Sequence, residues 1–154
     1  MTATTTPVLS STAPSTLRIA PSRLAIATFA GGFIALALNL LIFFVVQGPF
    51  GSALLIPGPT QAGTETPLAA GMVIAASIVP AIGAAFLLML LDRFTSRPIR
   101  IFQLTALVVG LLSLGGPLAL PLSWAVRLPL EAMHVCTAAA ITLCLSRSGS
   151  AKVA

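Results

Sequence analysis

The residues of this sequence best suited to chemistry are Glu131 and His134, which lie three positions apart. On an α-helix this spacing places both side chains on one face, about one turn apart. A Glu-x-x-His pair is half of the ligand set of a di-iron carboxylate site, which needs a second such pair and two further glutamates. The chain has only three acidic residues, Glu65, Asp92 and Glu131. One chain therefore cannot supply a di-iron site.

Several other uses of the pair stay open. A zinc site lacks ligands, because Cys136 and Cys144 lie further along the same helix. His134 could ligate a haem or chlorophyll, or relay a proton with Glu131. The favoured interpretation is structural, and no cofactor or metal is expected. The sequence also contains no nucleophile–base pair, phosphate loop or dinucleotide fingerprint, so we do not expect an enzyme.

The structural interpretation places Glu131 just after Pro129, in the first turn of its helix, where the helix dipole favours an acid. There Glu131 would stay ionised, with Arg127 as a nearby counter-charge, and would support His134. It follows that Glu131→Gln should lower stability by about 1–2 kcal/mol, the scale of a charge-assisted hydrogen bond.

Polar side chains within apolar runs suggest a wider cluster, because such groups are costly in hydrocarbon and tend to have a role there. Counting from the run ends at about 1.5 Å per residue places polar groups from all four runs at similar depths. We predict that Asn39 and His134 face inward, within reach of one another or joined by a water. The candidate cluster comprises Asn39, Ser77, Ser113, Glu131 and His134.

The elements that must position these residues are four long apolar runs, at residues 24–46, 68–91, 101–120 and 128–145. Crossing the hydrocarbon of a bilayer takes about 20 helical residues. Apolar residues make up 57% of the chain and charged residues 7%, against about a quarter charged in soluble domains. The sequence predicts an all-α integral membrane four-helix bundle over residues 23–146, with the lipid bilayer as its partner.

The basic residues predict the orientation of the bundle. Seven of the eight fall in the segments on the side of the two termini, and Arg127 falls on the other side. By the positive-inside rule both termini are cytoplasmic, in a multi-pass protein of the cell membrane. Residues 1–22, rich in Thr, Ser and Pro, are predicted to be a disordered cytoplasmic tail, and residues 147–154 a second tail. Basic residues confined to short segments between apolar runs do not indicate nucleic-acid binding.

Two further features concern packing and the loop after the first run. Small residues recur every four positions, which lets helix backbones approach closely within the bundle or against a partner. They are Ala27, Gly31 and Ala35 in the first run, Ala76, Pro80 and Ala84 in the second, and Ala106 and Gly110 in the third. Residues 47–67 contain four prolines, so irregular structure is expected there, with the apolar stretch 50–56 at the membrane interface.

The layout resembles a family of small bacterial four-helix membrane proteins of unknown function. The matching features are Leu38-Asn39-Leu40 in the first run, Val79-Pro80-Ala81 in the second, the Arg97-Pro98 turn, and Met133-His134-Val135 in the fourth. The resemblance covers residues 24–145 and implies a membrane location.

The small-residue faces and the lack of catalytic groups favour a non-enzymatic scaffold or accessory subunit, pairing with itself as a homo-oligomer or with a larger membrane complex. The alternative is a small dimeric transporter, or a ligand- or proton-binding membrane protein that uses Glu131 and His134. A membrane redox protein using His134 is the third possibility.

Overall fold

The computed structural model describes residues 19–49, 51, 53–57 and 64–149 of the chain. Tails were predicted at residues 1–22 and 147–154, and of these residues 1–18 and 150–154 lie outside the described residues. The rest of both tails belongs mainly to helices, because Pro21 and Ser22 begin the first helix and Arg147 and Ser148 end the last one.

Four helices make up the fold: α1 (Pro21–Gln47), α2 (Ala70–Phe94), α3 (Pro98–Ala119) and α4 (Trp124–Ser148). Each is long and apolar enough to cross a membrane, which confirms the predicted four-helix membrane bundle. Proline occupies the first position of α1 and α3, where its missing N–H has no helical partner to lose. The helix α4 begins at Trp124, four residues before the apolar run that predicted it.

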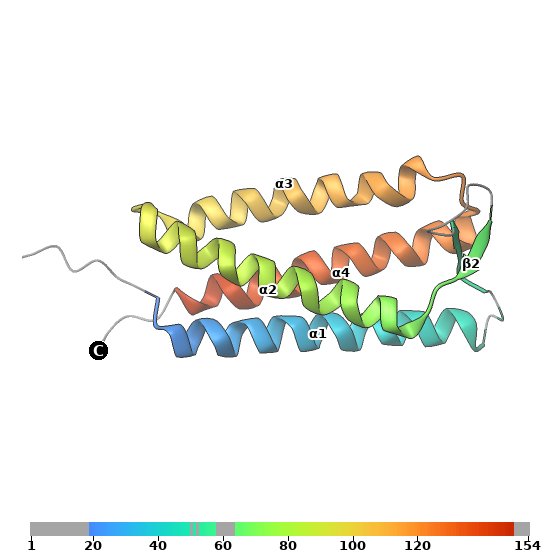
Figure 1. Ribbon diagram of the computed structural model, residues 1–154, viewed down its shortest axis with the longest axis horizontal. Helices are drawn as coiled ribbons and strands as arrows, with labels where there is room; N and C mark the ends of the chain where they lie inside the picture. The colour runs from blue at the N-terminus through green and yellow to red at the C-terminus, as the bar shows by residue number, and fades with distance from the viewer. Residues whose placement is uncertain (1–18, 50, 52, 58–63, 150–154) are drawn as a thin grey trace, which may run out of the picture.

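The helices do not pack equally against one another (Figure 1). The helix α1 packs most extensively with α4 and with α2, whereas α3 contacts α4 and, less closely, α2. From their shared turn at residues 95–97, α2 and α3 diverge toward the opposite end of the bundle. The helix α3 therefore lies at the edge of the fold.

A pair of short strands follows α1, where irregular structure was expected. Strands β1 (Leu55–Pro57) and β2 (Glu65–Pro67) are antiparallel, with Ile56 opposite Thr66. Both prolines are tolerated because each strand of a two-stranded sheet has a free edge. Next to the sheet, Leu54 is completely buried rather than interfacial, and its carbonyl accepts a 2.8 Å hydrogen bond from the Leu68 N–H.

We call this end of the bundle, with β1, β2 and the α3–α4 turn, the strand end. The other holds the start of α1, the α2–α3 turn and the end of α4, and we call it the arginine end for Arg23, Arg93, Arg97, Arg100 and Arg147.

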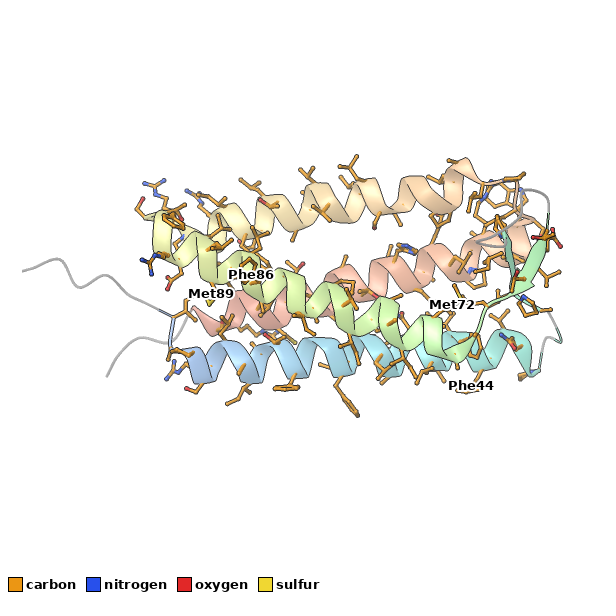
Figure 2. The ribbon with its side chains drawn as sticks, in the orientation of Figure 1. Phe44, Met72, Phe86 and Met89 are labelled. Carbon is orange, nitrogen blue, oxygen red and sulfur yellow. The ribbon has the colours of Figure 1, made fainter. Side chains whose placement is uncertain are left out.

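Each end has its own apolar core. At the strand end the buried cluster contains Phe43, Leu54, Leu68, Val73, Val126 and Met133. At the arginine end it contains Ala81, Leu88, Phe102, Ile141 and Leu145. Other large apolar side chains, such as Phe44, Phe86 and Met89, are exposed on the outside of the bundle (Figure 2). In a bilayer that outer surface faces lipid tails, which are as apolar as these side chains, so no hydrophobic force acts to bury them.

Candidate functional site

Asn39 is the centre of a hydrogen-bonded group that joins three helices. Its Nδ2 donates to Ser77 Oγ on α2 at 2.9 Å and to Thr137 Oγ1 on α4 at 2.8 Å. The Ser77 hydroxyl in turn donates to the Val73 carbonyl at 2.8 Å. Asn39 is 3% exposed and Ser77 is fully buried. We call Asn39, Ser77 and Thr137 the amide hub, and it ties α1, α2 and α4 together at mid-bundle.

The direction of the Asn39 amide follows from its partners. The Ser77 hydroxyl donates its hydrogen to the Val73 carbonyl, so its oxygen can only accept from Asn39. The amide nitrogen of Asn39, rather than its oxygen, therefore faces Ser77. Asn39 Oδ1 is buried and has no hydrogen-bond partner among the described residues. Both N–H groups of the Asn39 amide are therefore hydrogen-bonded in the hub, and its amide oxygen is not.

Close backbone packing reinforces the hub on the α1 side. A Cβ added to Gly31 would lie 3.2 Å from Ile141 Cα and 3.2 Å from Cys144 Cβ, both on α4. A Cβ added to Gly32 would lie 3.3 Å from Ala81 Cβ on α2. The small residues of α1 are thus used inside the chain, where they let α4 and α2 approach.

His134 does not bond to Asn39, whose α4 partner is Thr137, three residues further on. Instead His134 Nδ1 lies 2.7 Å from the carbonyl oxygen of Leu130. Since a carbonyl only accepts, Nδ1 is the donor, and Nε2 of the neutral ring is an acceptor. With α4 beginning at Trp124, His134 lies about 15 Å along the helix axis from its start.

Glu131 does not have the role expected of it. It is the eighth residue of α4 and not in the first turn, because the helix begins before Pro129. Within the described residues Glu131 forms no ion pair and no hydrogen bond, including none to His134. Its Oε1 is buried without a partner. The first-turn interpretation of Glu131 is therefore wrong.

The structure brings only part of the predicted cluster together. Asn39 and Ser77 are bonded directly, and Asn39, Ser113 and His134 line one cavity. The Ser113 hydroxyl donates to the Gly110 carbonyl of its own helix at 2.7 Å, and Glu131 does not line the cavity. The cluster lacked Thr137, although its spacing of three residues from His134 puts both on one face of α4.

The cavity has a volume of about 700 Å³ and lies between α2, α3 and α4. Its residues are mostly small or apolar, with a few polar groups. They are Asn39, Ile56, Leu68, Met72, Val73, Ala76, Pro80, Gly83, Ala84, Leu87, Phe102, Thr105, Ala106, Val109, Gly110, Ser113, Leu130, Met133, His134, Thr137, Ala138, Ile141 and Thr142.

The exposure of these residues shows where the cavity opens. Residues of α4 form its half-buried floor, whereas Met72 on α2 is 46% exposed and Val109 on α3 is 57% exposed. Met72 lies on α2 toward the strand end, where α2 and α3 have diverged (Figure 2). At the strand end the buried Leu68 borders the cavity, and at the arginine end the buried Phe102 does. The cavity thus opens sideways, between α2 and α3.

Small side chains on α2 and α3 leave this space. On α2 the cavity wall is built from Ala76, Pro80 and Gly83, and a Cβ added to Gly83 would meet nothing within 4 Å. On α3, Gly110 approaches α4 at Ala138, with 3.4 Å between an added Cβ and Ala138 Cβ. The small residues of α2 therefore face open space, unlike those of α1.

A family model described as a family of unknown function (DUF6069) matches residues 19–151. The chain belongs to the DUF6069 family. This confirms the resemblance to a small four-helix membrane family of unknown function. No curated protein and no solved structure matches the chain. The matched region of this DUF6069 protein includes all four helices, the amide hub and the cavity.

Three other residues of the DUF6069 chain that could do chemistry, Arg127, Cys136 and Cys144, do not line the cavity. Arg127 Nη2 donates to the carbonyl of Leu120, the residue that caps α3, at 2.9 Å, and its guanidinium lies 4.9 Å from the centre of the Trp124 ring. Cys136 and Cys144 are free thiols. Across the described part of the chain, no three His, Cys, Asp or Glu residues are grouped closely enough to hold a metal ion.

Proposed function

We propose that this protein is a non-enzymatic membrane protein that binds a largely apolar, membrane-dissolved molecule in the cavity between α2, α3 and α4. The observation that carries the proposal is the cavity of about 700 Å³ itself. Sites for small molecules typically measure about 300–1,000 Å³, are mainly apolar with a few polar groups, and occur between the helices of bundles.

The position of the opening supports a ligand that enters from the bilayer. The exposed cavity walls belong to α2 and α3, two helices long and apolar enough to cross a membrane. A molecule entering between them comes from hydrocarbon rather than from water. Buried Leu68 and Phe102 border the cavity at its two ends, which argues against a path for a water-soluble substrate. A transporter site using Glu131 is disfavoured further, because Glu131 does not line the cavity.

A scaffold or accessory subunit is the second candidate. The observation that favours it is the exposed small residues of α2, Ala76, Pro80 and Gly83, because such a surface also accepts a helix of a partner. The small residues of α1 no longer support this candidate, since Gly31 and Gly32 are used within the chain.

Filling the cavity tests the proposal. Ala76→Leu and Gly83→Leu each add bulk to the α2 wall, and Gly83 has free space around it. The matched control is Gly115→Leu, which also meets nothing within 4 Å but does not line the cavity. The lipid retained per protein is measured by mass spectrometry after purification in mild detergent.

We expect wild type and Gly115→Leu to retain a bound lipid-like molecule and both cavity variants to lose it. Equal retention in all four proteins would contradict ligand binding. A membrane protein that co-purifies with wild type and Gly115→Leu, but not with the cavity variants, would support the scaffold instead.

We also propose that the arginine end faces the cytoplasm. Its arginines, including Arg23, Arg97 and Arg147, contrast with the single Arg127 at the strand end, a bias that follows the positive-inside rule. A reporter active only in the cytoplasm, fused after Ala154, should be active, and so should a periplasm-active reporter inserted at Gly63. If neither reporter is active, the proposed orientation is wrong.

A further inference from the structure

The polar groups that line the cavity are unevenly divided between donors and acceptors. Three of the donor groups are already occupied: Asn39 Nδ2 by the amide hub, the Ser113 hydroxyl by Gly110, and His134 Nδ1 by Leu130. The hydroxyls of three threonines can donate or accept. They are Thr105, Thr137 and Thr142.

His134 supplies an acceptor that the protein itself does not use. Because Nδ1 donates to the Leu130 carbonyl, the tautomer with its hydrogen on Nδ1 presents the lone pair of Nε2. Nε2 has no hydrogen bond within the described residues and is not among their buried unpaired atoms, so it is accessible, and His134 lines the cavity. A molecule in the cavity can therefore reach it.

Two prolines leave backbone carbonyls of cavity-lining residues without their usual helical donors. Pro80 in α2 and Pro117 in α3 have no N–H, so the carbonyls four residues earlier lack their helical donors. Those carbonyls belong to Ala76 and Ser113, and both residues line the cavity. His134 Nε2 is thus an acceptor at the cavity with no donor from the described residues, and a ligand that pairs with it must bring a donor of its own.

Building on the proposed function, we propose that the ligand is a neutral lipid whose hydrogen-bonding group is a hydroxyl, and that this hydroxyl donates to His134 Nε2. Its hydrocarbon portion fills the apolar remainder of the cavity. A hydrocarbon without a donor leaves Nε2 unpaired, as does an ether. A hydroxyl can donate to His134 while accepting from a threonine such as Thr137.

The test compares three probes of similar length, namely 1-hexadecanol, methyl hexadecyl ether and hexadecane, at equal mole fraction in detergent micelles. Apparent affinities are derived from the dependence of Tm on probe concentration. The full chain is compared with His134→Phe and with His134→Gln, whose amide oxygen is an acceptor. The control is Thr28→Val on α1, because Thr28 bonds within its own helix and does not line the cavity. Each variant is compared with itself without probe, so a loss of stability does not obscure the result.

We expect wild type and Thr28→Val to bind the alcohol about three- to tenfold more tightly than the ether, the value of one hydrogen bond. His134→Phe should lose this preference and bind the alcohol only as weakly as the ether. His134→Gln should keep part of the preference for the alcohol.

Equal binding of alcohol and ether by wild type, with both weakened by Gly83→Leu, would overturn the hydroxyl proposal and leave cavity binding intact. Failure of all three probes would overturn both proposals. An intense Soret band in the purified protein that His134→Phe abolishes would assign the cavity to a tetrapyrrole and overturn the lipid.

Discussion

The two sides of α4 use the same kinds of residue to opposite effect. On the α1 side, Gly31 brings the helices into contact, and Asn39 binds across three helices. On the α3 side, Gly83 and its small neighbours on α2 border open space, and the Ser113 hydroxyl turns back to its own helix. One side is a packed, hydrogen-bonded unit and the other is a cavity.

A small residue in a membrane helix therefore permits a close approach of another helix but does not produce one. Without a hydrophobic force between helices in lipid, packing and interhelical hydrogen bonds decide which helices approach. The amide hub fastens α1, α2 and α4 at mid-bundle. In the middle of α3, the described residues provide no side-chain hydrogen bond to another helix, and its buried residues, Phe102 and Pro117, lie near its two ends.

The largest effect is expected from Gly31→Leu. Its Cβ would press against the backbone of α4 at Ile141, which cannot move aside as a flexible side chain would. We expect a loss of about 3 kcal/mol, at the upper end of the usual cost of overpacking, measured as the unfolding free energy in detergent. Gly83→Leu is the control on the open side and should cost less than about 1 kcal/mol, because nothing lies near its Cβ. Similar losses for both variants would abolish the distinction between the two sides.

Next in size is the loss of the amide hub. Asn39→Ala removes two interhelical hydrogen bonds, and we expect it to cost about 1–2 kcal/mol. Ser113→Ala on the α3 side removes only a bond within one helix and should change stability by less than about 0.5 kcal/mol. Thermal unfolding of both variants under one detergent condition measures the difference. A larger loss from Ser113→Ala would show that the side chain of Ser113 supports the position of α3.

Arg127→Ala examines how α3 is held at the strand end. The change removes the bond to the Leu120 carbonyl and the contact with Trp124, and we expect it to cost about 1 kcal/mol. Hydrogen–deuterium exchange should rise in residues 111–119 and stay unchanged in α1. Arg93→Ala, which loses only a contact of 5.9 Å with the Phe94 ring, is the matched control. Faster exchange in α1 would contradict a local role for Arg127.

The smallest effect is expected from Glu131→Gln. Glu131 has no ion pair or hydrogen bond within the described residues, so the substitution breaks none. We expect a change of less than about 0.5 kcal/mol, against the 1–2 kcal/mol expected from the sequence. Glu65→Gln, at an exposed position on β2, controls for the loss of a negative charge. A loss of unfolding free energy above about 1 kcal/mol for Glu131→Gln, but not for Glu65→Gln, would support the charge-assisted bond to His134 that the sequence suggested.

Much of the site was foreseeable in kind but not in detail. Asn39, Ser77 and His134 are polar residues within apolar runs, so their cost in lipid alone predicts inward faces. Which of them meet depends on the rotation and tilt of each helix. Thr137 and His134 are about one helical turn apart on α4. A shift of α1 along α4 by one turn would therefore exchange one for the other as the partner of Asn39.

Four membrane helices and an asymmetric distribution of arginines follow from the sequence, because the length of an apolar run and the position of a charge can be read along one chain. The pairing of β1 with β2, the burial of Leu54 and the start of α4 before Pro129 follow from tertiary packing. Tertiary packing also decides that Gly31 touches α4 while Gly83 faces a cavity. Those outcomes depend on distances between segments far apart in the chain, which no local pattern of small or apolar residues specifies.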